Sequence, residues 1–185
     1  MSGSARSLPL LELPRGRRLA DQNDETYARA PEPEDVVRIC RALNDARARY
    51  VLIGGFAVVA HGAGRLTKDI DFLVEDSPEN VARVKQALGV LADNAAAAVN
   101  DTDVRDYAVV RVADEVLVDL MGRACGLSYD EVAADAEMHD LGGVLVPVAS
   151  PSALIRTKQT TRPQDAVDRA FLEDVLRERG APESG

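Results

Sequence analysis

The chain has 185 residues, of which 46% are hydrophobic, and a net charge of −9. This length and composition are typical of one domain with a sizeable core, and the acidic balance excludes a broad basic face for non-specific nucleic-acid binding. No apolar run is long enough for a membrane span, and the first residues lack a signal-peptide pattern. We therefore expect a cytoplasmic protein with no membrane partner.

The two cysteines and two histidines also limit the kinds of site. Cys40 and Cys125 lie far apart, and neither belongs to a CxxC pair. A disulfide framework or a zinc knuckle is therefore not predicted, and buried reduced thiols are expected instead. His61 and His139 are the only histidines, so a histidine-built metal site is not predicted either.

The first elements can be placed from the hydrophobic pattern. Residues 1–32 are polar and have no sustained period, which predicts a flexible or loosely docked N-terminal arm. A helix is expected from Pro33 to about Ala48, because apolar residues follow at helical spacing and Pro33 suits the first turn. The next segment predicts a buried strand over 50–53, a tight turn at Gly54-Gly55, a short helix over 56–62 and a second strand over 68–74.

The second half predicts a helix from Ser77, a β-hairpin of 106–112 and 115–121, a helix over about 129–137 and a strand over 143–148. Two helices follow from about Pro151 and Pro163, the second ending at Gly180. The predicted fold class is α/β (α+β), with a small mixed, partly antiparallel sheet flanked by helices. In this scheme residues 33–150 form the core, and residues 151–180 form a helix pair that completes the same domain.

Two aspartates stand out in the segment "KDIDFLV". Side chains at positions i and i+2 of a strand point to the same face, so Asp69 and Asp71 are expected side by side. Two carboxylates about 4 Å apart repel by about 4 kcal/mol at an effective dielectric near 20. A divalent ion such as Mg²⁺ would relieve this repulsion, and it prefers carboxylates together with substrate phosphates. The alternative is a strand end whose aspartates face water.

The residues just before this strand favour an anion site. Gly54-Gly55 lies where a buried strand meets a helix, so that backbone N–H groups can approach a phosphate. Arg65 and Lys68 bring positive charge, and Thr67 brings a hydroxyl, immediately before the aspartates. A structural turn is the alternative for the glycines, and solvated surface charge is the alternative for the basic residues.

A third carboxylate is predicted at Asp119, which interrupts the otherwise apolar strand "EVLVDLM". A buried acid without a partner would be costly. Asp119 can serve as a general base for an incoming hydroxyl, as a metal ligand, or as both. The alternative is a structural ion pair with Arg111 across the hairpin.

Taken in order, these elements resemble the nucleotidyltransferase superfamily with the DNA polymerase β-type catalytic core. More narrowly, "GGFAVVAHGAGRLTKDIDFLV" and the later "SPSALIRTKQTTRPQDAVDRAFLEDVL" resemble small bacterial nucleotidyltransferases that include the AbiEii-type toxins of toxin–antitoxin systems. The resemblance covers residues 50–177. One departure is that many members have Gly-Ser where this chain has Gly54-Gly55.

The resemblance implies Mg²⁺- or Mn²⁺-dependent transfer of a nucleoside monophosphate from a nucleoside triphosphate, with pyrophosphate leaving. By the family pattern, Asp69 and Asp71 would bind the metal ions and Asp119 would be the third carboxylate. The glycine pair would hold the phosphates, and Lys158 would stabilise the triphosphate. Asp165 would help to order the C-terminal helix pair, or lie on its surface.

Several acceptors fit this reaction: an RNA such as the tRNA 3′ end, a protein side chain or a small molecule. A cognate antitoxin or toxin protein is a further expected partner. The alternative function is that of a catalytically inactive relative that binds a nucleotide or a partner protein.

Overall fold

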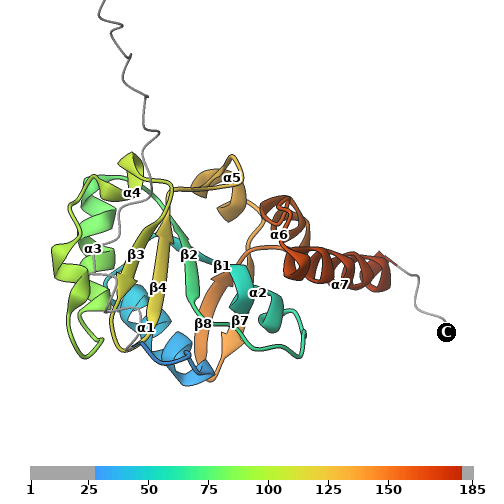
Figure 1. The fold of residues 1–185 in the computed structure, drawn as a ribbon, viewed down its shortest axis with the longest axis horizontal. Coiled ribbons are helices and arrows are strands. Elements are labelled where there is room, and N and C mark those ends of the chain that lie inside the picture. Colours follow the sequence, from blue (N-terminus) through green and yellow to red (C-terminus); the bar gives the residue numbers. More distant parts are fainter. Residues whose placement is uncertain (1–27, 181–185) are drawn as a thin grey trace, which may run out of the picture.

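The computed structural model of the protein describes residues 28–180, so residues 1–27, most of the expected N-terminal arm, lie outside it, as do residues 181–185. Figure 1 shows a sheet with helices packed around it. The elements in chain order are α1 (Pro33–Asp45), β1 (Tyr50–Ile53), α2 (Gly54–Ala60), β2 (Ile70–Val74), α3 (Pro78–Leu88), η2 (Ala95–Ala98), α4 (Asp103–Asp106), β3 (Val110–Ala113), β4 (Leu117–Met121), β5 (Arg123–Ala124), β6 (Leu127–Ser128), α5 (Tyr129–Ala133), β7 (Glu137–Leu141), β8 (Val144–Val148), α6 (Pro151–Thr157) and α7 (Pro163–Gly180).

The main sheet has six strands in the order β3-β4-β2-β1-β8-β7. Strands β1 and β2, β3 and β4, and β7 and β8 pair antiparallel, whereas β2 pairs parallel with β4 and β1 pairs parallel with β8. Strands β1, β2 and β4 are almost fully buried and rich in branched apolar residues, as expected for strands covered on both faces. The predicted mixed, partly antiparallel sheet with flanking helices is confirmed.

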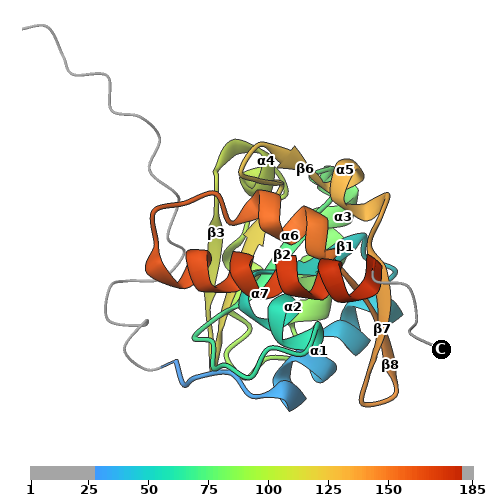
Figure 2. The same cartoon turned by 90° about the vertical axis from the view of Figure 1, so that its right-hand side faces the viewer.

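One face of the sheet packs against α1. The rings of Tyr50 and Phe72 meet edge to face with centroids 5.6 Å apart, and the Tyr50 hydroxyl donates to Asn44 Oδ1 of α1 at 2.9 Å. Because side chains alternate along β2, Asp71 must point to the opposite face from Phe72. Helices α2, α6 and α7 lie on that opposite side (Figure 2).

The C-terminal helices begin as predicted. Ser150 caps α6 by accepting from the Ala153 N–H at 3.1 Å, and proline stands in the first turn of α6 and of α7. Helices α6 and α7 pack side by side (Figure 2). Within residues 28–180, none of the helices has the length and apolar character that crossing a membrane requires.

One predicted element is wrong. The helix expected over 129–137 ends at Ala133, and Glu137–Leu141 forms the edge strand β7. Its partner β8 follows a two-residue turn, Gly142-Gly143, in which both residues have positive φ (60° and 81°). The polar sequence of β7 hides it from pattern analysis, because only one side of an edge strand is paired.

Smaller differences concern element ends. Helix α1 stops at Asp45 instead of about Ala48, and the first hairpin strand starts at Val110 because residues 103–106 form the short helix α4. Strand β2 starts at Ile70, so Asp69 lies just before it. The glycine pair is the first turn of α2 itself and not a separate turn.

Candidate active site

The three predicted carboxylates come together on the α2 side of the sheet. Strand register places Asp71 of β2 directly beside Asp119 of β4 in a parallel pair, and Asp69 precedes Asp71 by two residues. Oxygen atoms from the three side chains all lie within 4.8 Å of one another. We call Asp69, Asp71 and Asp119 the acidic trio.

Arg111 faces the acidic trio from β3. Its Nε and Nη2 donate to the two carboxylate oxygens of Asp119, both at 2.8 Å, and Nη2 lies 3.6 Å from Asp69 Oδ2. The ion pair weighed against a catalytic Asp119 is therefore present. It does not remove Asp119 from the site, because each carboxylate oxygen has two lone pairs and can accept again. Arg111 orients Asp119 within the acidic trio.

The charged form of Asp71 is disfavoured in this arrangement. Burial, followed by the negative charges of Asp69 and Asp119, raises the pKa of Asp71 to about 7. Lys158 and the backbone N–H of Gly55 act in the opposite direction but do not cancel this effect. The side chains around Asp71 therefore leave its negative charge under-compensated at neutral pH.

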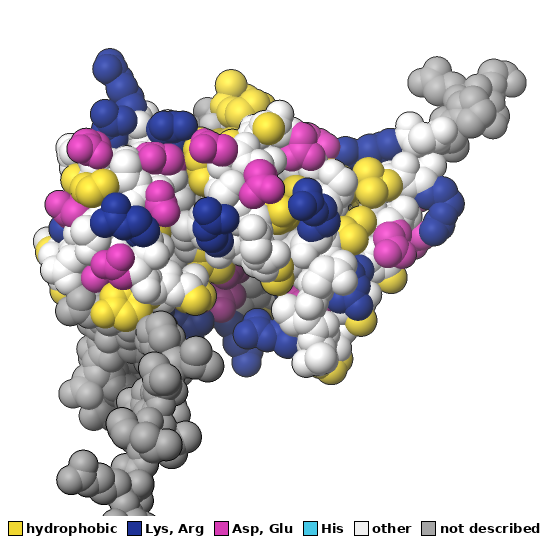
Figure 3. All heavy atoms as spheres, turned by 90° about the horizontal axis from the view of Figure 1, so that it is seen from above, with side chains coloured by type: hydrophobic (Ala, Val, Ile, Leu, Met, Phe, Trp, Pro, Cys, Tyr) yellow, Lys and Arg dark blue, Asp and Glu magenta, His cyan; other side chains and the backbone are white. Residues whose placement is uncertain are grey.

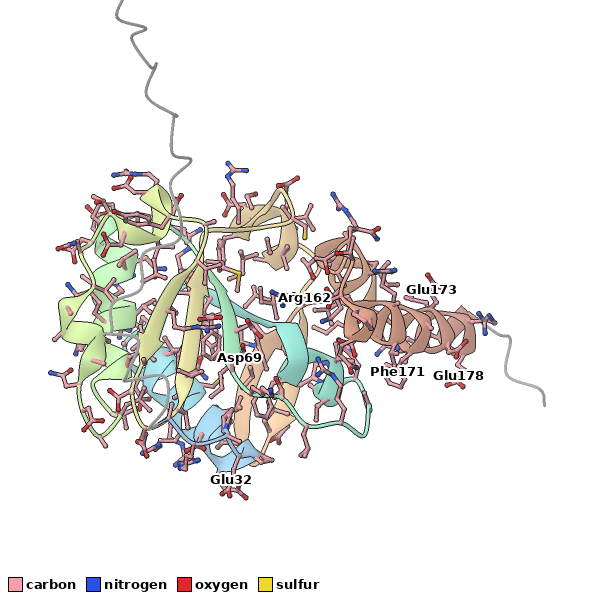
Figure 4. All side chains as sticks on the ribbon, viewed as in Figure 1. Glu32, Asp69, Arg162, Phe171, Glu173 and Glu178 are labelled. Atoms are coloured by element: carbon pink, nitrogen blue, oxygen red, sulfur yellow. The ribbon has the colours of Figure 1, made fainter. Side chains whose placement is uncertain are left out.

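The acidic trio lies in a pocket of about 810 Å³. Asp69 is at the centre of the view in Figure 4, and Arg162 approaches from the loop between α6 and α7; both line the pocket. Figure 3 shows acidic side chains recessed beneath Lys and Arg side chains at the lower edge of the molecule. The cationic residues lining this pocket are Arg65, Lys68, Arg111, Arg123, Lys158 and Arg162.

The glycine pair is required by close contacts with Asp71 of β2 and with the loop before that strand. Gly54 has φ of +64°, and a Cβ atom there would lie 1.9 Å from Asp71 Oδ2. A Cβ atom on Gly55 would lie 2.4 Å from Thr67 Oγ1. The Thr67 hydroxyl thus fills the space that a serine at position 55 would need, and the site keeps a hydroxyl despite the departure from Gly-Ser.

Lys158 is buried at the end of α6, where it is 7% exposed. Its Nζ lies 2.8 Å from Asp168 Oδ2 and 3.5 Å from Asp165 Oδ1, so these two acidic residues of α7 hold it. Asp168 also accepts from Arg65 Nη2 at 3.0 Å. Burial opposes the charged form of Asp168, but hydrogen bonds from Lys158 and Gln164 and the nearby cations lower its pKa below the usual range.

Comparison with known proteins gives a family for this arrangement. Residues 38–174 match the family described as "Nucleotidyl transferase AbiEii toxin, Type IV TA system". The chain belongs to the AbiEii family. No curated protein matches it significantly. Among solved structures it is similar to a candidate nucleotidyltransferase from Thermotoga maritima, with 14% identity, a TM-score of 0.47 and coverage of 79% of this chain and 90% of that one.

The AbiEii match spans every predicted site residue, and it confirms the resemblance first found in residues 50–177. Gly54, Gly55, Arg65, Thr67, Lys68 and Lys158 all line the pocket with the acidic trio. Lys68 is exposed at the rim, whereas Lys158 is buried in the wall. The structure thus gathers residues that are up to 104 positions apart, from Gly54 to Lys158, around one pocket.

Sequence reasoning missed Asp168, which contacts two of the predicted site residues. Asp165 and Asp168 are three residues apart on α7 and therefore share a helix face, and this spacing was an available signal. Arg123 was not predicted to line the pocket either. Its position depends on the short β5–β6 hairpin, for which the sequence has no periodic pattern.

Proposed function

We propose that this AbiEii-family chain transfers a nucleoside monophosphate from a nucleoside triphosphate to a hydroxyl acceptor. The observation that carries the proposal is the acidic trio, whose oxygens lie within 4.8 Å at the base of a pocket lined with cationic side chains. The acceptor oxygen would bond to the α-phosphorus as the bond to the pyrophosphate oxygen breaks. The proton of the hydroxyl would pass to a carboxylate, for which Asp119 is the proposed base.

The acidic trio fits a hard divalent cation. Its donors are all carboxylate oxygens, which suit Mg²⁺ or Mn²⁺. Burial, followed by the negative charges of Asp69 and Asp119, raises the pKa of Asp71, and a bound cation would offset both effects. We propose that Asp69, Asp71 and Asp119 hold Mg²⁺. When bound, Mg²⁺ would neutralise phosphate charge and favour loss of the acceptor proton.

The cationic side of the pocket is proposed to hold the triphosphate. Gly54, Gly55 and Thr67 line the same pocket as Arg65 and Lys68. Arg65 Nε is buried and has no hydrogen-bond partner among residues 28–180, which is a costly state for a donor. Lys158, held by Asp165 and Asp168, is proposed to stabilise charge that develops on the leaving pyrophosphate.

The catalytic unit is proposed to comprise residues 33–150 together with the helix pair of residues 151–180. Six lining residues come from the helix pair and its loop, among them Lys158, Arg162 and Asp165, so the core alone would leave one wall open. The family description names a toxin of a type IV toxin–antitoxin system. We therefore propose a toxin role, with a cognate antitoxin as partner and RNA, protein or a small molecule as acceptor.

The test uses each α-labelled nucleoside triphosphate in turn, Mg²⁺, and separated cellular RNA, protein and small-molecule fractions. The parent protein is expected to label one fraction, which identifies both the acceptor class and the nucleotide. The double variant Asp69→Asn/Asp71→Asn is expected to label none. Glu173→Gln removes an exposed carboxylate on α7 (Figure 4) and is the matched control, expected to label as the parent does.

The outcomes separate the two functional alternatives. Nucleotide binding without labelling in any fraction would contradict the transferase and favour the inactive, partner-binding relative. Labelling that persists in the double variant would contradict the assignment of the acidic trio.

A further inference from the structure

A second cluster of potential metal ligands lies outside the active-site pocket. His61 follows the last residue of α2, and Glu137 and His139 share one side of the edge strand β7, two residues apart. One ligand atom from each side chain lies within 4.8 Å of the others. The fold thus brings together the two histidines that the sequence did not connect.

The tautomer of His61 is determined by its neighbours. His61 Nε2 lies 2.9 Å from the Ala149 carbonyl oxygen, which can only accept, so Nε2 must carry the proton. The other ring nitrogen, Nδ1, faces Arg179 Nη2 at 3.5 Å, and a guanidinium can only donate. Both contacts place the lone pair on Nδ1, which points into the cluster. The His61 side chain is fully buried, and burial lowers its pKa and favours the neutral ring.

The two carboxylate oxygens of Glu137 have different neighbours: one faces Arg179 and the other faces the two histidines. Its Oε1 accepts from Arg179 Nη1 at 2.7 Å. Its Oε2 lies 3.5 Å from His139 Nε2 and 4.0 Å from His61 Nδ1. The two imidazole rings are nearly perpendicular, with centroids 4.9 Å apart. Glu137 Oε2 therefore faces a nitrogen from each ring.

We propose that His61 Nδ1, Glu137 Oε2 and His139 Nε2 form a binding site for a zinc-like transition-metal ion. Two imidazoles and one carboxylate are a donor set that Zn²⁺ uses in proteins, with a fourth position left for water. In a tetrahedral site with bonds of about 2.0–2.1 Å, ligand atoms lie about 3.3 Å apart. The present separations, up to 4.8 Å, would have to shorten by up to about 1.5 Å on binding.

The groups behind the ligands support this assignment. Metal-binding histidines usually donate their other ring N–H to a carbonyl or carboxylate, as His61 does to Ala149. Arg179 holds Glu137 through Oε1 and leaves Oε2 for the metal. Its positive charge also lies close to the site and opposes a divalent ion. Zn²⁺ binding would therefore be weakened by Arg179 but would not require its departure.

The two metal sites differ in chemistry and position. The acidic trio has only hard oxygen donors, whereas the histidine cluster has two imidazole nitrogens, which select softer ions. Helix α2 connects the sites, with Gly54 in the pocket and His61 at its other end. Zn²⁺ in the histidine cluster would fasten the end of α2 to β7.

The test measures Zn²⁺ binding to full-length protein carrying Cys125→Ser, which removes an exposed thiol, a type of side chain that zinc prefers as a ligand. Because the chain has only two histidines, ¹⁵N imidazole NMR follows both directly. One equivalent of Zn²⁺ is expected to shift both rings, to leave the Nε2 proton on His61 and to raise the melting temperature. Co²⁺ is expected to give the visible absorption of a tetrahedral site.

Partly exposed ligands are chosen for substitution, since His61 is buried and its loss would disturb folding. His139→Gln and Glu137→Gln are each expected to weaken Zn²⁺ binding by at least about tenfold. Arg179→Gln keeps a donor, removes the charge, and is expected to tighten binding. Asp69→Asn is the control and is expected to change Zn²⁺ affinity less than twofold.

Unchanged imidazole signals in the presence of saturating Zn²⁺ would overturn the proposal. Affinity that survives both His139→Gln and Glu137→Gln, or that is lost in Asp69→Asn, would overturn it as well. None of these readouts depends on nucleotide transfer, so the site stands or fails separately from the proposed function.

Discussion

Asp35 and Asp71 are both withdrawn from solvent in the same domain, yet their surroundings have opposite effects. Asp35 is 4% exposed, and its oxygens accept from Arg29 at 2.6 and 2.8 Å and from Arg38 at 3.1 Å. The hydrogen bonds from Arg29 are the main reason that its pKa is lowered to about 2. Asp71 instead has two other carboxylates as neighbours, and burial, followed by their negative charges, raises its pKa to about 7.

The difference separates a structural carboxylate from a candidate functional one. Asp35 also accepts from the Glu32 N–H at 2.9 Å and so caps the start of α1 while its charge is matched. Asp71 has no comparable neutralisation from the side chains around it. A fold keeps such an arrangement at a cost in stability, and perturbed carboxylates of this kind are typical of functional sites.

The largest expected effect is on activity, when Asp71 loses its negative charge. Asp71→Asn preserves the shape of the side chain but removes a charged metal ligand and is expected to lower nucleotide transfer by about 10³-fold or more. Label incorporation per folded molecule is the measurement. Asp35→Asn serves as the control and is expected to retain transfer within a few-fold. Similar losses in both variants would contradict the division between them.

The next effect concerns stability. Asp35→Asn removes one of the two carboxylates that Arg29 and Arg38 share, the other being that of Glu115. It is expected to lower the free energy of unfolding by about 2 kcal/mol, since both arginines are partly exposed. Urea denaturation measures the change. Glu34→Gln, an exposed acid in the same helical turn, is expected to cost less than about 0.5 kcal/mol. A loss as large in Glu34→Gln would indicate a general helix effect instead.

A pH dependence should distinguish the two aspartates without mutation of the site. Unfolded Asp71 releases its proton near pH 4, whereas folded Asp71 retains it to about pH 7. Between these values the folded state binds more protons, so stability decreases as pH rises. Without divalent ions, we expect Asp71 to contribute a loss of between about 1 and 2 kcal/mol from about pH 5.5 to about pH 7.5.

The control for this measurement is Asp71→Asn, which should lack that contribution, as should the parent protein with saturating Mg²⁺. Asp35 has the opposite sign: its contribution is present above about pH 4 and is lost as the pH falls toward 2. Equal pH profiles for the parent and Asp71→Asn would show that other groups cause the slope.

The smallest effect concerns the role of Asp119, which accepts two parallel hydrogen bonds from Arg111. Arg111→Lys keeps the positive charge but loses the two parallel hydrogen bonds that orient the carboxylate. Transfer is expected to fall about fivefold, equivalent to about 1 kcal/mol, with the KM for the triphosphate nearly unchanged. A rise in KM with constant kcat would instead place Arg111 in substrate binding.

Much of the fold could be predicted because its patterns are local. Strands β1 and β2 are short apolar runs beside glycines, and α6 and α7 begin at prolines with a capping serine in one case. Strand β7 could not be predicted, since Glu137, His139 and Asp140 resemble a solvated segment until they are paired with β8. The short helices also lacked a sustained period.

The candidate site divides in the same way. Strand geometry predicted that Asp69 and Asp71 lie close together, although Asp69 lies just before β2, and the sequence order of the motif indicated Asp119 and Lys158. The pairing of Lys158 with Asp168 and the meeting of His61 with His139 depend on how distant elements pack. No local pattern encodes such contacts, so they required the structure.

The register between β2 and β4 has a consequence for how such proteins diversify. Asp71 and Asp119 face each other because of hydrogen bonds between two strands, and residues 75–109, the excursion between β2 and β3, make no part of that alignment. Insertions or deletions in this excursion would leave the carboxylates in place, whereas one residue added within β4 would turn Asp119 to the opposite face. Among homologues, we expect variation in length and in acceptor preference to occur in this segment between β2 and β3 and not within the strands themselves.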